Sequence, residues 1–245
     1  MILFASDLHL SPRSPGATRL FLDFLGGRAR QASELYLLGD LFETWIGDDD
    51  IDDPDNVAIV AALRAAADSG VNIAVMHGNR DFLLGEAFAA AAGVRLIDEP
   101  YILSTAEWQF VLAHGDALCL DDGEYMRFRD QVRSQAWQSA FLARPLAERR
   151  AIAAQMRAAS EASQRDKHNP YTDLQPAATE DFLRQHGYAT FIHGHTHQPA
   201  THDHIVDGIH VERWVLADWH EERGECLVWD GEALRREAVL PEKRA

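Results

Sequence analysis

The sequence predicts an α/β protein in which helices cover a largely parallel sheet and polar residues gather at one edge of that sheet. Three short apolar runs in the first hundred residues alternate with stretches of helical periodicity. Strands that alternate with helices favour parallel pairing, because each helix carries the chain back to the edge where the next strand begins. Glycine or aspartate lies close behind each run, and ligand sites of open α/β sheets lie at the carboxyl ends of strands.

The first half of the chain supplies three strands and three helices in alternation. Four apolar residues between positions 20 and 25 recur at helical spacing, and a glycine follows each of the three predicted helices. We expect strands at Ile2–Ala5, Leu35–Leu38 and Val71–Met76, and helices over Leu20–Leu25, Val57–Ala67 and Phe82–Ala92.

The second half is expected to add a second sheet whose strands are joined by tight turns. Its apolar runs are short and rich in β-branched and aromatic residues, which is typical of strands. The predicted strands of this sheet are Tyr101–Leu103, Gln109–Leu112, Thr190–Ile192, Ile209–Leu216 and Glu225–Trp229.

A helical segment over residues 121–168, here called the insertion, interrupts this series of strands. Arg144-Pro145 divides it into two helices, because a residue that precedes proline avoids the α conformation. We expect one domain, residues 1–245, in which the insertion covers the polar edge of the sheet as a lid. A plain structural hairpin packed on the body is the alternative. The apolar residues that line its helices are Tyr125, Phe128, Val132, Trp137, Phe141, Leu146, Ile152, Met156 and Ala159.

Length, composition and charge narrow the function further. The 245 residues, 47% of them apolar, can bury a sizeable core, and no apolar stretch reaches the roughly eighteen residues of a membrane span. No secretory signal is recognisable, so Cys119 and Cys226 are expected to be reduced, buried thiols rather than a disulfide. The net charge of −16 argues against nucleic-acid binding, which usually needs a basic face.

The charge is distributed unevenly. The insertion holds nine basic and seven acidic residues, a net charge of +2, which leaves −18 on the remainder of the chain. A basic segment on an acidic body indicates a specific anionic partner. The acidic run Asp48–Asp55 lacks the glycine and terminal glutamate of an EF-hand, so we expect it to be a solvated loop.

Short polar motifs spread over nearly 200 residues carry the chemistry. Taken singly they are weak: an acidic turn with a surface histidine explains an Asp-x-His, and a lone histidine at a strand end is often bonded to backbone. Taken together they supply hard oxygen and imidazole ligands beside glycines, which indicates two divalent metals. The motifs are Asp7-Leu8-His9, Gly39-Asp40, Gly78-Asn79-Arg80-Asp81, His114 and Gly194-His195-Thr196-His197.

This series of motifs resembles the calcineurin-like metallophosphoesterase superfamily over almost the whole chain. The resemblance implies a four-layer αββα sandwich with a dimetal centre at the sheet edge. It also implies two ligand groups that share Asp40 as a bridge. One metal would be held by Asp7, His9, Asp40 and His197, and Asn79, His114 and His195 would complete the second.

The ligand chemistry limits the metal and the reaction. Oxygen and nitrogen ligands without thiolate favour manganese, iron or magnesium over a structural zinc. Among these, the family resemblance implies two Mn²⁺ ions. Two such ions about 3.5–4 Å apart can share a water, lower its pKa to about 7 and direct it at phosphorus. No serine or cysteine nucleophile is then needed.

The identity of residue 80 indicates which kind of phosphorus–oxygen bond the protein would cleave. Many members of the superfamily have histidine after the asparagine, whereas this chain has arginine. Arginine stays protonated, so it stabilises charge but cannot supply a proton to a leaving group. A phosphate leaving group needs no acid, which favours cleavage of a phosphoanhydride. The alternative is that Arg80 only pairs with Asp81 or Asp40. We expect catalytic roles for Asp40, Asn79, Arg80 and His195.

Four further stretches narrow the resemblance to the UDP-2,3-diacylglucosamine pyrophosphatase family of lipid A synthesis. That family implies water attack at the α-phosphorus of UDP-2,3-diacylglucosamine, which gives UMP and 2,3-diacylglucosamine 1-phosphate (lipid X). It also implies that the insertion helps to enclose the acyl chains. The stretches are Asp40–Glu43, Trp45–Asp49, His77–Phe82 and Phe141–Leu146.

Substrate contacts are expected on one face near the end of the insertion. Ser160, Gln164 and Lys167 are spaced four and three apart, so they share a helix face. The resemblance assigns them to the substrate together with Asp122, Asn79, Arg80 and His195. A solvated polar face is the alternative.

The remaining expectations concern location and competing functions. We expect a cytoplasmic monomer that associates peripherally with the cytoplasmic face of the inner membrane, since basic residues are attracted to anionic headgroups. The alternatives are a phosphomonoesterase or phosphodiesterase acting on a soluble nucleotide and a non-enzymatic scaffold. A nuclease conflicts with the acidic body. The arginines expected at the membrane are Arg127, Arg129, Arg133, Arg144, Arg149, Arg150 and Arg157.

Overall fold

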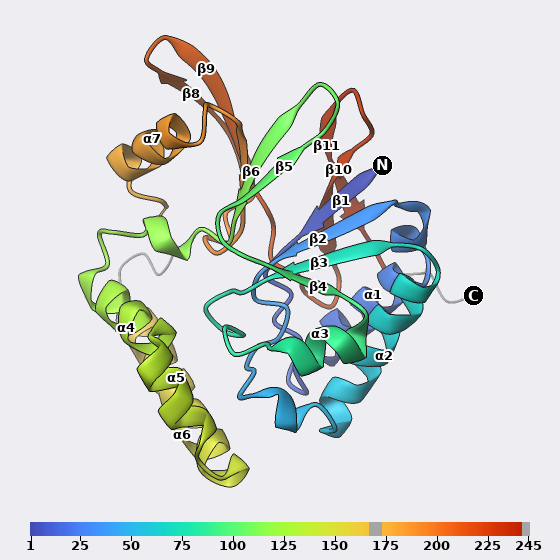
Figure 1. Cartoon of the computed structure of the whole chain (residues 1–245), viewed down its shortest axis with the longest axis vertical. Coiled ribbons are helices and arrows are strands. Elements are labelled where there is room, and N and C mark those ends of the chain that lie inside the picture. The colour runs from blue at the N-terminus through green and yellow to red at the C-terminus, as the bar shows by residue number, and fades with distance from the viewer. Residues whose placement is uncertain (167–172, 242–245) are drawn as a thin grey trace.

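The computed structural model, which describes residues 1–166 and 173–241, contains two mixed sheets packed face to face (Figure 1). The first sheet has the order β11-β10-β1-β2-β3-β4, in which β1 to β4 are parallel and β10 and β11 are antiparallel to their neighbours. Its strands are β1 (Ile2–Ala5), β2 (Glu34–Leu38), β3 (Asn72–Met76), β4 (Arg95–Ile97), β10 (Gly224–Trp229) and β11 (Leu234–Val239).

The second sheet has the order β5-β6-β7-β9-β8. Its three central strands β6, β7 and β9 run parallel, while β5 and β8 are antiparallel edge strands. The strands are β5 (Tyr101–Ser104), β6 (Gln109–Ala113), β7 (Thr190–His193), β8 (Ala200–Val206) and β9 (Ile209–Val215).

Helices cover the outer faces of both sheets, so the predicted four-layer αββα arrangement is confirmed. Helices α1 (Pro15–Gly26), α2 (Pro54–Asp68) and α3 (Glu86–Ala92) pack on the first sheet, and α7 (Pro176–Gln185) packs on the second. Successive residues of β1 point to opposite faces. Leu3 therefore packs among the helices, whereas Phe4 packs against Phe110 between the two sheets.

The second half of the chain differs from the sequence prediction. Glu225–Trp229 was expected in the second sheet, but this strand lies in the first, where Val228 is opposite Leu3 of β1. An apolar run indicates a buried strand without identifying its partner, because pairing is a long-range property. The sequence reasoning did not predict β4, β8, β11 or α7.

Helix α3 is shorter than the predicted helix Phe82–Ala92. Its first residue is Glu86, because Gly85 before it is extended with φ −125° and ψ −169°. The carboxylate of Asp48 accepts hydrogen bonds from the N–H groups of Gly85 (2.9 Å) and Phe88 (3.0 Å). A side chain from a distant loop thus satisfies the first turn of the helix.

The insertion forms three helices rather than two. These are α4 (Gly123–Arg133), α5 (Gln135–Leu142) and α6 (Leu146–Asp166), which Figure 1 shows as an arm beside the sheets. Ser134 separates α4 from α5, since its ψ of 137° is extended and its hydroxyl accepts a hydrogen bond from the N–H of Trp137. Residues 167–168, which end the predicted insertion, lie outside the described residues.

The acidic run Asp48–Asp55 is not the solvated loop that we expected. Arg149 of α6 is buried and forms an ion pair with Asp49, while Arg150 contacts Asp50 at 2.5 Å and Asp53 at 2.7 Å. The acidic body is therefore itself an anionic partner of the basic insertion.

Two simpler expectations concern the cysteines and the membrane. Cys119 and Cys226 are free and buried, as predicted. Among the described residues, none of the helices combines the length and the apolar character needed to cross a bilayer.

Candidate metal centre

The expected ligands all follow parallel strands, whose carboxyl ends meet where the two sheets adjoin. Three loops come from the first sheet and two from the second. Asp7 and His9 follow β1, Asp40 follows β2, Asn79 follows β3, His114 follows β6, and His195 and His197 follow β7.

The backbone of these loops is unusual. Five expected ligands have positive φ angles between 48° and 67°, a conformation that costs about 1–3 kcal/mol for residues other than glycine. Only two other non-glycine residues in the described part of the chain share it. Such strain tends to gather at functional sites. The five residues are Asp7, His9, Asp40, His195 and His197.

The glycines beside the ligands allow the loops to approach closely. A Cβ atom added to Gly78 would lie 2.1 Å from Oδ1 of Asp40, and one added to Gly194 would lie 2.0 Å from Oγ of Ser6. Neither distance is tolerable, so both positions require glycine. This is the physical reason why the motifs pair a ligand with a glycine.

The first ligand group consists of Asp7, His9 and His197. One donor atom from each lies within 4.8 Å of the others. Nε2 of His197 is 3.2 Å from Nε2 of His9 and 3.4 Å from Oδ1 of Asp7. These short distances make the carboxylate and the two imidazoles a compact set of ligands, and Asp7 is completely buried.

The second ligand group consists of Asn79, His114 and His195. Oδ1 of Asn79 is 3.0 Å from Nε2 of His114 and 2.9 Å from Nδ1 of His195. Nδ1 of His114 lies 2.9 Å from the carbonyl oxygen of Leu38, to which it donates a hydrogen bond. Such a backbone contact orients the ring and leaves Nε2 directed at the centre.

Asp40 lies between the two groups. Its Oδ2 is 3.8 Å from Nε2 of His9, and its Oδ1 is 3.8 Å from Nε2 of His114. A donor atom of Asp7 also lies within 4.8 Å of donors from Asp40 and His114. The buried carboxylate thus faces both groups at once, as a bridging ligand must.

The electrostatics of the centre favour a cation. Burial by itself would lower the pKa of His114, but the charges of Asp40, Asp116 and Asp7 raise it to about 9. Burial opposes ionisation of Asp7, yet the hydrogen bond and charge of His197 lower the pKa of Asp7. A buried site that stabilises positive charge on an imidazole also stabilises a metal ion. The oxygen and nitrogen donors fit divalent cations.

His195 is held in the neutral form that binds metals. Burial, followed by the positive charge of His114, lowers the pKa of His195 to about 4. The backbone N–H group of His195 donates to both carboxylate oxygens of Asp7, at 3.1 and 2.9 Å. This bond connects the first and second ligand groups through the backbone.

Asp81 organises two of the loops, a role that sequence reasoning missed. Its buried carboxylate accepts hydrogen bonds from the N–H groups of Gly78 and Leu41, both at 2.8 Å. The backbone N–H group of Arg80 donates to Oδ1 of Asp40 at 2.8 Å. The side chain of Arg80 lines the cavity described below.

Two further acidic residues were also missed. Nδ1 of His9 is 2.8 Å from Oε2 of Glu43, and Nδ1 of His197 is 3.5 Å from Oδ2 of Asp218. These carboxylates turn the opposite ring nitrogen towards the centre. Glu43 follows Asp40 by three residues, which is a usable signal, whereas Asp218 has no local pattern around it.

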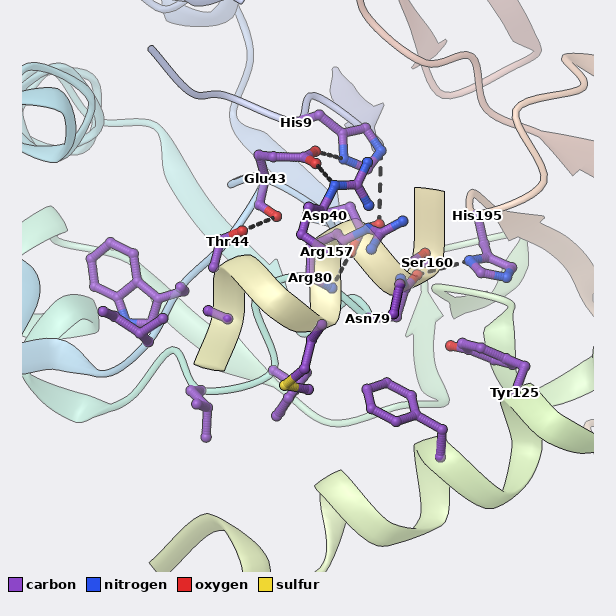
Figure 2. Close-up of a pocket in the computed structure, with 18 of the residues that line it drawn as sticks. His9, Asp40, Glu43, Thr44, Asn79, Arg80, Tyr125, Arg157, Ser160 and His195 are labelled. Carbon is purple, nitrogen blue, oxygen red and sulfur yellow. Dashed lines mark hydrogen bonds and ion pairs between the residues drawn. The ribbon is translucent and has the colours of Figure 1, made fainter. Parts of the chain in front are cut away.

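A cavity of about 500 Å³ joins the centre to the insertion (Figure 2). Polar residues of the centre line one part, and side chains of α4, α5 and α6 line another. The lining includes His9, Asp40, Asn79, Arg80, His195, His197, Tyr125, Phe128, Trp137, Phe141, Met156, Arg157 and Ser160.

The expected substrate contacts are placed unevenly. Ser160 and Asp122 line the cavity, and Oδ1 of Asp122 also accepts a hydrogen bond from the N–H of Tyr125 at the start of α4. Gln164 lies in the last turns of α6. Lys167 lies outside the described residues.

Comparison with known proteins identifies related sequences and folds. The model of the calcineurin-like phosphoesterase family matches residues 1–199. The chain is 49% identical over 229 residues to the UDP-2,3-diacylglucosamine hydrolase of Aromatoleum aromaticum, covering 94% of this chain and 93% of the relative. It is 46% identical over 222 residues to the hydrolase of the same name from Chromohalobacter salexigens, covering 91% and 90%.

The solved structures extend the likeness to the fold alone. A dimetal phosphatase from Danio rerio superimposes with a TM-score of 0.54 at 13% identity, covering 98% of each chain.

Proposed function

Because the chain belongs to the calcineurin-like phosphoesterase family, we propose that it is a metal-dependent UDP-2,3-diacylglucosamine hydrolase of lipid A biosynthesis. The observation that carries this proposal is a single cavity that joins a cluster of hard metal ligands to an apolar chamber. A lipid-linked nucleotide sugar needs both: polar groups at its diphosphate and an apolar enclosure for its acyl chains.

The proposed reaction is attack of water on the α-phosphorus of the diphosphate. The bond from that phosphorus to the bridging oxygen breaks, and the products are UMP and 2,3-diacylglucosamine 1-phosphate. Two divalent cations, when bound, supply an activated water and neutralise phosphate charge. A phosphate leaving group departs without a proton, so the fixed charge of Arg80 suits this reaction better than a titrating acid.

We assign the metal ligands by group. Asp7, His9 and His197 would hold one ion, Asn79, His114 and His195 the other, and Asp40 would bridge them. The distances to both oxygens of Asp40 support the bridge. We propose Mn²⁺ as the metal, since hard oxygen and imidazole donors suit it.

The polar part of the cavity would bind the diphosphate and sugar. The guanidinium of Arg80 can form paired hydrogen bonds with phosphate oxygens. Asn79 and His195 line the same cavity, and Ser160 approaches from α6 (Figure 2). Asp122, Gln164 and Lys167 complete the proposed substrate contacts, and Asp40, Asn79, Arg80 and His195 the proposed catalytic set.

We assign residues 121–168 as a lid on a single domain that spans residues 1–245. The apolar side chains of Phe128, Trp137, Phe141 and Met156 line the part of the cavity that the insertion forms, where acyl chains would lie. Trp137 and Phe141 stack with a centroid separation of 4.8 Å, which gives the chamber a flat wall.

We also propose peripheral binding to the cytoplasmic face of the inner membrane. Fewer arginines are available for this contact than we expected from the sequence. Of the seven arginines expected at the membrane, five pair with acidic residues outside their own helical turn, Arg144 forms only a surface ion pair with Glu148, and both Arg127 and Arg144 are exposed. Phe128 and Leu142 add exposed apolar surface. Sedimentation with anionic vesicles at low salt tests this proposal, and absence of binding would end it. We propose a monomer, which analytical ultracentrifugation would test.

The function is tested by release of UMP from UDP-2,3-diacylglucosamine, with Mn²⁺ and with a chelator. We expect release that depends on metal and is restored when Mn²⁺ is added back. Faster hydrolysis of a soluble aryl phosphate than of the lipid nucleotide would favour a general phosphoesterase instead.

A further inference from the structure

One face of helix α4 lies on a buried carboxylate next to the metal centre. Tyr125, Arg129 and Arg133 are four residues apart and therefore share that face. Oδ2 of Asp116, a completely buried residue, lies 2.7 Å from the hydroxyl of Tyr125, 2.8 Å from Nε of Arg129 and 3.5 Å from a terminal nitrogen of Arg133. We call these three side chains the α4 clamp.

One member of the α4 clamp contacts a ligand of the second group, and a second contacts the residue that precedes another ligand. The ring of Tyr125 stacks on the ring of His195, with centroids 5.8 Å apart and planes inclined by 30° (Figure 2). Arg133 donates a hydrogen bond of 3.1 Å to the carbonyl oxygen of Gly78, the residue before Asn79.

The third member reaches the remaining ligand through one intermediary. Arg129 pairs with Oε2 of Glu99 at 3.4 Å. Oε1 of Glu99 accepts hydrogen bonds from the N–H groups of His114 (2.8 Å) and Gly115 (3.1 Å). Each clamp residue is thus tied to a different ligand of the second group.

We propose that the α4 clamp, held by Asp116 as a positioning residue, sets the geometry of the Asn79–His114–His195 metal group. The inference rests on the proposed dimetal function. The first group has different supports, because Glu43 orients His9 and Asp218 orients His197. Disruption of the clamp therefore affects one metal and spares the other.

The expected loss of metal affinity can be estimated from what happens when a residue that contacts a metal ligand is removed. Loss of such a partner typically lowers metal affinity about 10–100-fold. Because Asp116 is buried, removal of one of its donors leaves its negative charge incompletely compensated, which is costly in a buried site. Asp122, the N-cap residue of α4, lines the cavity, so a proposed substrate contact and the clamp lie on the same helix.

The test is a Mn²⁺ titration of the chelator-stripped full chain by calorimetry. The wild type is expected to bind two ions. Arg133→Met should weaken one binding step about 10–100-fold and leave the other unchanged. Arg127→Met is the matched control, because Arg127 is an exposed arginine of the same helix, and it should leave both steps unchanged.

A second variant guards against misfolding. Asp116→Asn should show the same selective loss, and Asp130→Asn, at an exposed position of α4, should not. Thermal melts identify variants that fail to fold. Equal weakening of both steps, or wild-type affinity at both steps in folded Arg133→Met, would overturn the clamp. A wild type that binds fewer than two ions would overturn the dimetal assignment and the clamp together.

Discussion

Oε2 of Glu43 lies 2.8 Å from Nδ1 of His9, and this contact directs the other nitrogen of the ring at Asp40 and His197. The same carboxylate forms an ion pair with Arg157 of α6. Although burial opposes ionisation, the hydrogen bond from His9 lowers the pKa of Glu43 and keeps it charged. Glu43 therefore connects the first ligand group to the insertion.

Replacement of Glu43 by glutamine should weaken Mn²⁺ binding at the first group. The variant keeps the size of the side chain but loses the charge that fixes the His9 ring, and a loss of about 10–100-fold in affinity is expected. Calorimetry measures it. Glu148→Gln removes an exposed charge from α6 and serves as control. Unchanged affinity in Glu43→Gln would show that His9 needs no such support.

Replacement of Asp40 by alanine should abolish turnover. Asp40 faces both ligand groups, so its loss should lower kcat by more than the roughly 100-fold upper value for an outer partner. UMP release at saturating Mn²⁺ is the measurement, and Asp52→Ala, at an exposed position of the acidic run Asp48–Asp55, is the control. Full activity of Asp40→Ala would refute the bridging assignment.

The candidate ligands could be predicted from the sequence because each leaves a local signal. An apolar strand, a glycine and a hard ligand follow one another within a few residues, and parallel pairing brings such strand ends together. Asp218 leaves no such signal: it reaches His197 from 21 positions further along the chain. Asp116 was likewise visible only as the residue after Gly115, since its three donors come from α4.

The fold shows the same division between local and distant causes. The run Glu225–Trp229 indicated a strand, but its place beside β1 depends on pairing across more than 200 residues. The start of α3 was misjudged because Asp48, 37 positions before Gly85, caps it. The acidic run was misjudged because its arginine partners lie about a hundred residues away, on α6.

Removal of Arg149 should destabilise the protein. Its side chain is 2% exposed and donates to the carbonyl oxygens of Ile46 (2.6 Å) and Arg144 (3.0 Å). Arg149→Met leaves these acceptors without their donor, which costs about 1–3 kcal/mol of unfolding free energy. Urea denaturation measures the loss.

The control for this variant is Arg144→Met. Arg144 is exposed, and its contact of 3.7 Å with Glu148 is a surface ion pair. Such pairs contribute little, so a change within about 0.5 kcal/mol is expected. Equal losses in the two variants would contradict the role assigned to the buried guanidinium of Arg149.

His193 should make the protein sensitive to acid. It is fully buried; its Nδ1 donates to the carbonyl oxygen of Gly194 (2.8 Å) and its Nε2 accepts from Arg213 (3.1 Å). Burial, and then the charge of Arg213, lower the pKa of His193 to about 3. An unfolded histidine titrates near about 6.5, so below that pH the unfolded chain takes up a proton that the native protein excludes. The free energy of unfolding should therefore fall as the pH is lowered from about 6.5 towards 3.

The variant His193→Gln isolates this effect, because glutamine does not titrate. Urea denaturation of the metal-free proteins between pH 7.5 and 4.5 should show the wild type losing its stability advantage over the variant as the pH falls. Metal-free conditions keep acid release of metal out of the comparison. His210→Gln, at an exposed position of β9, should follow the wild-type curve. A constant difference between wild type and His193→Gln across this range would mean that His193 takes up its proton as readily in the native protein as in the unfolded chain, which would refute the prediction.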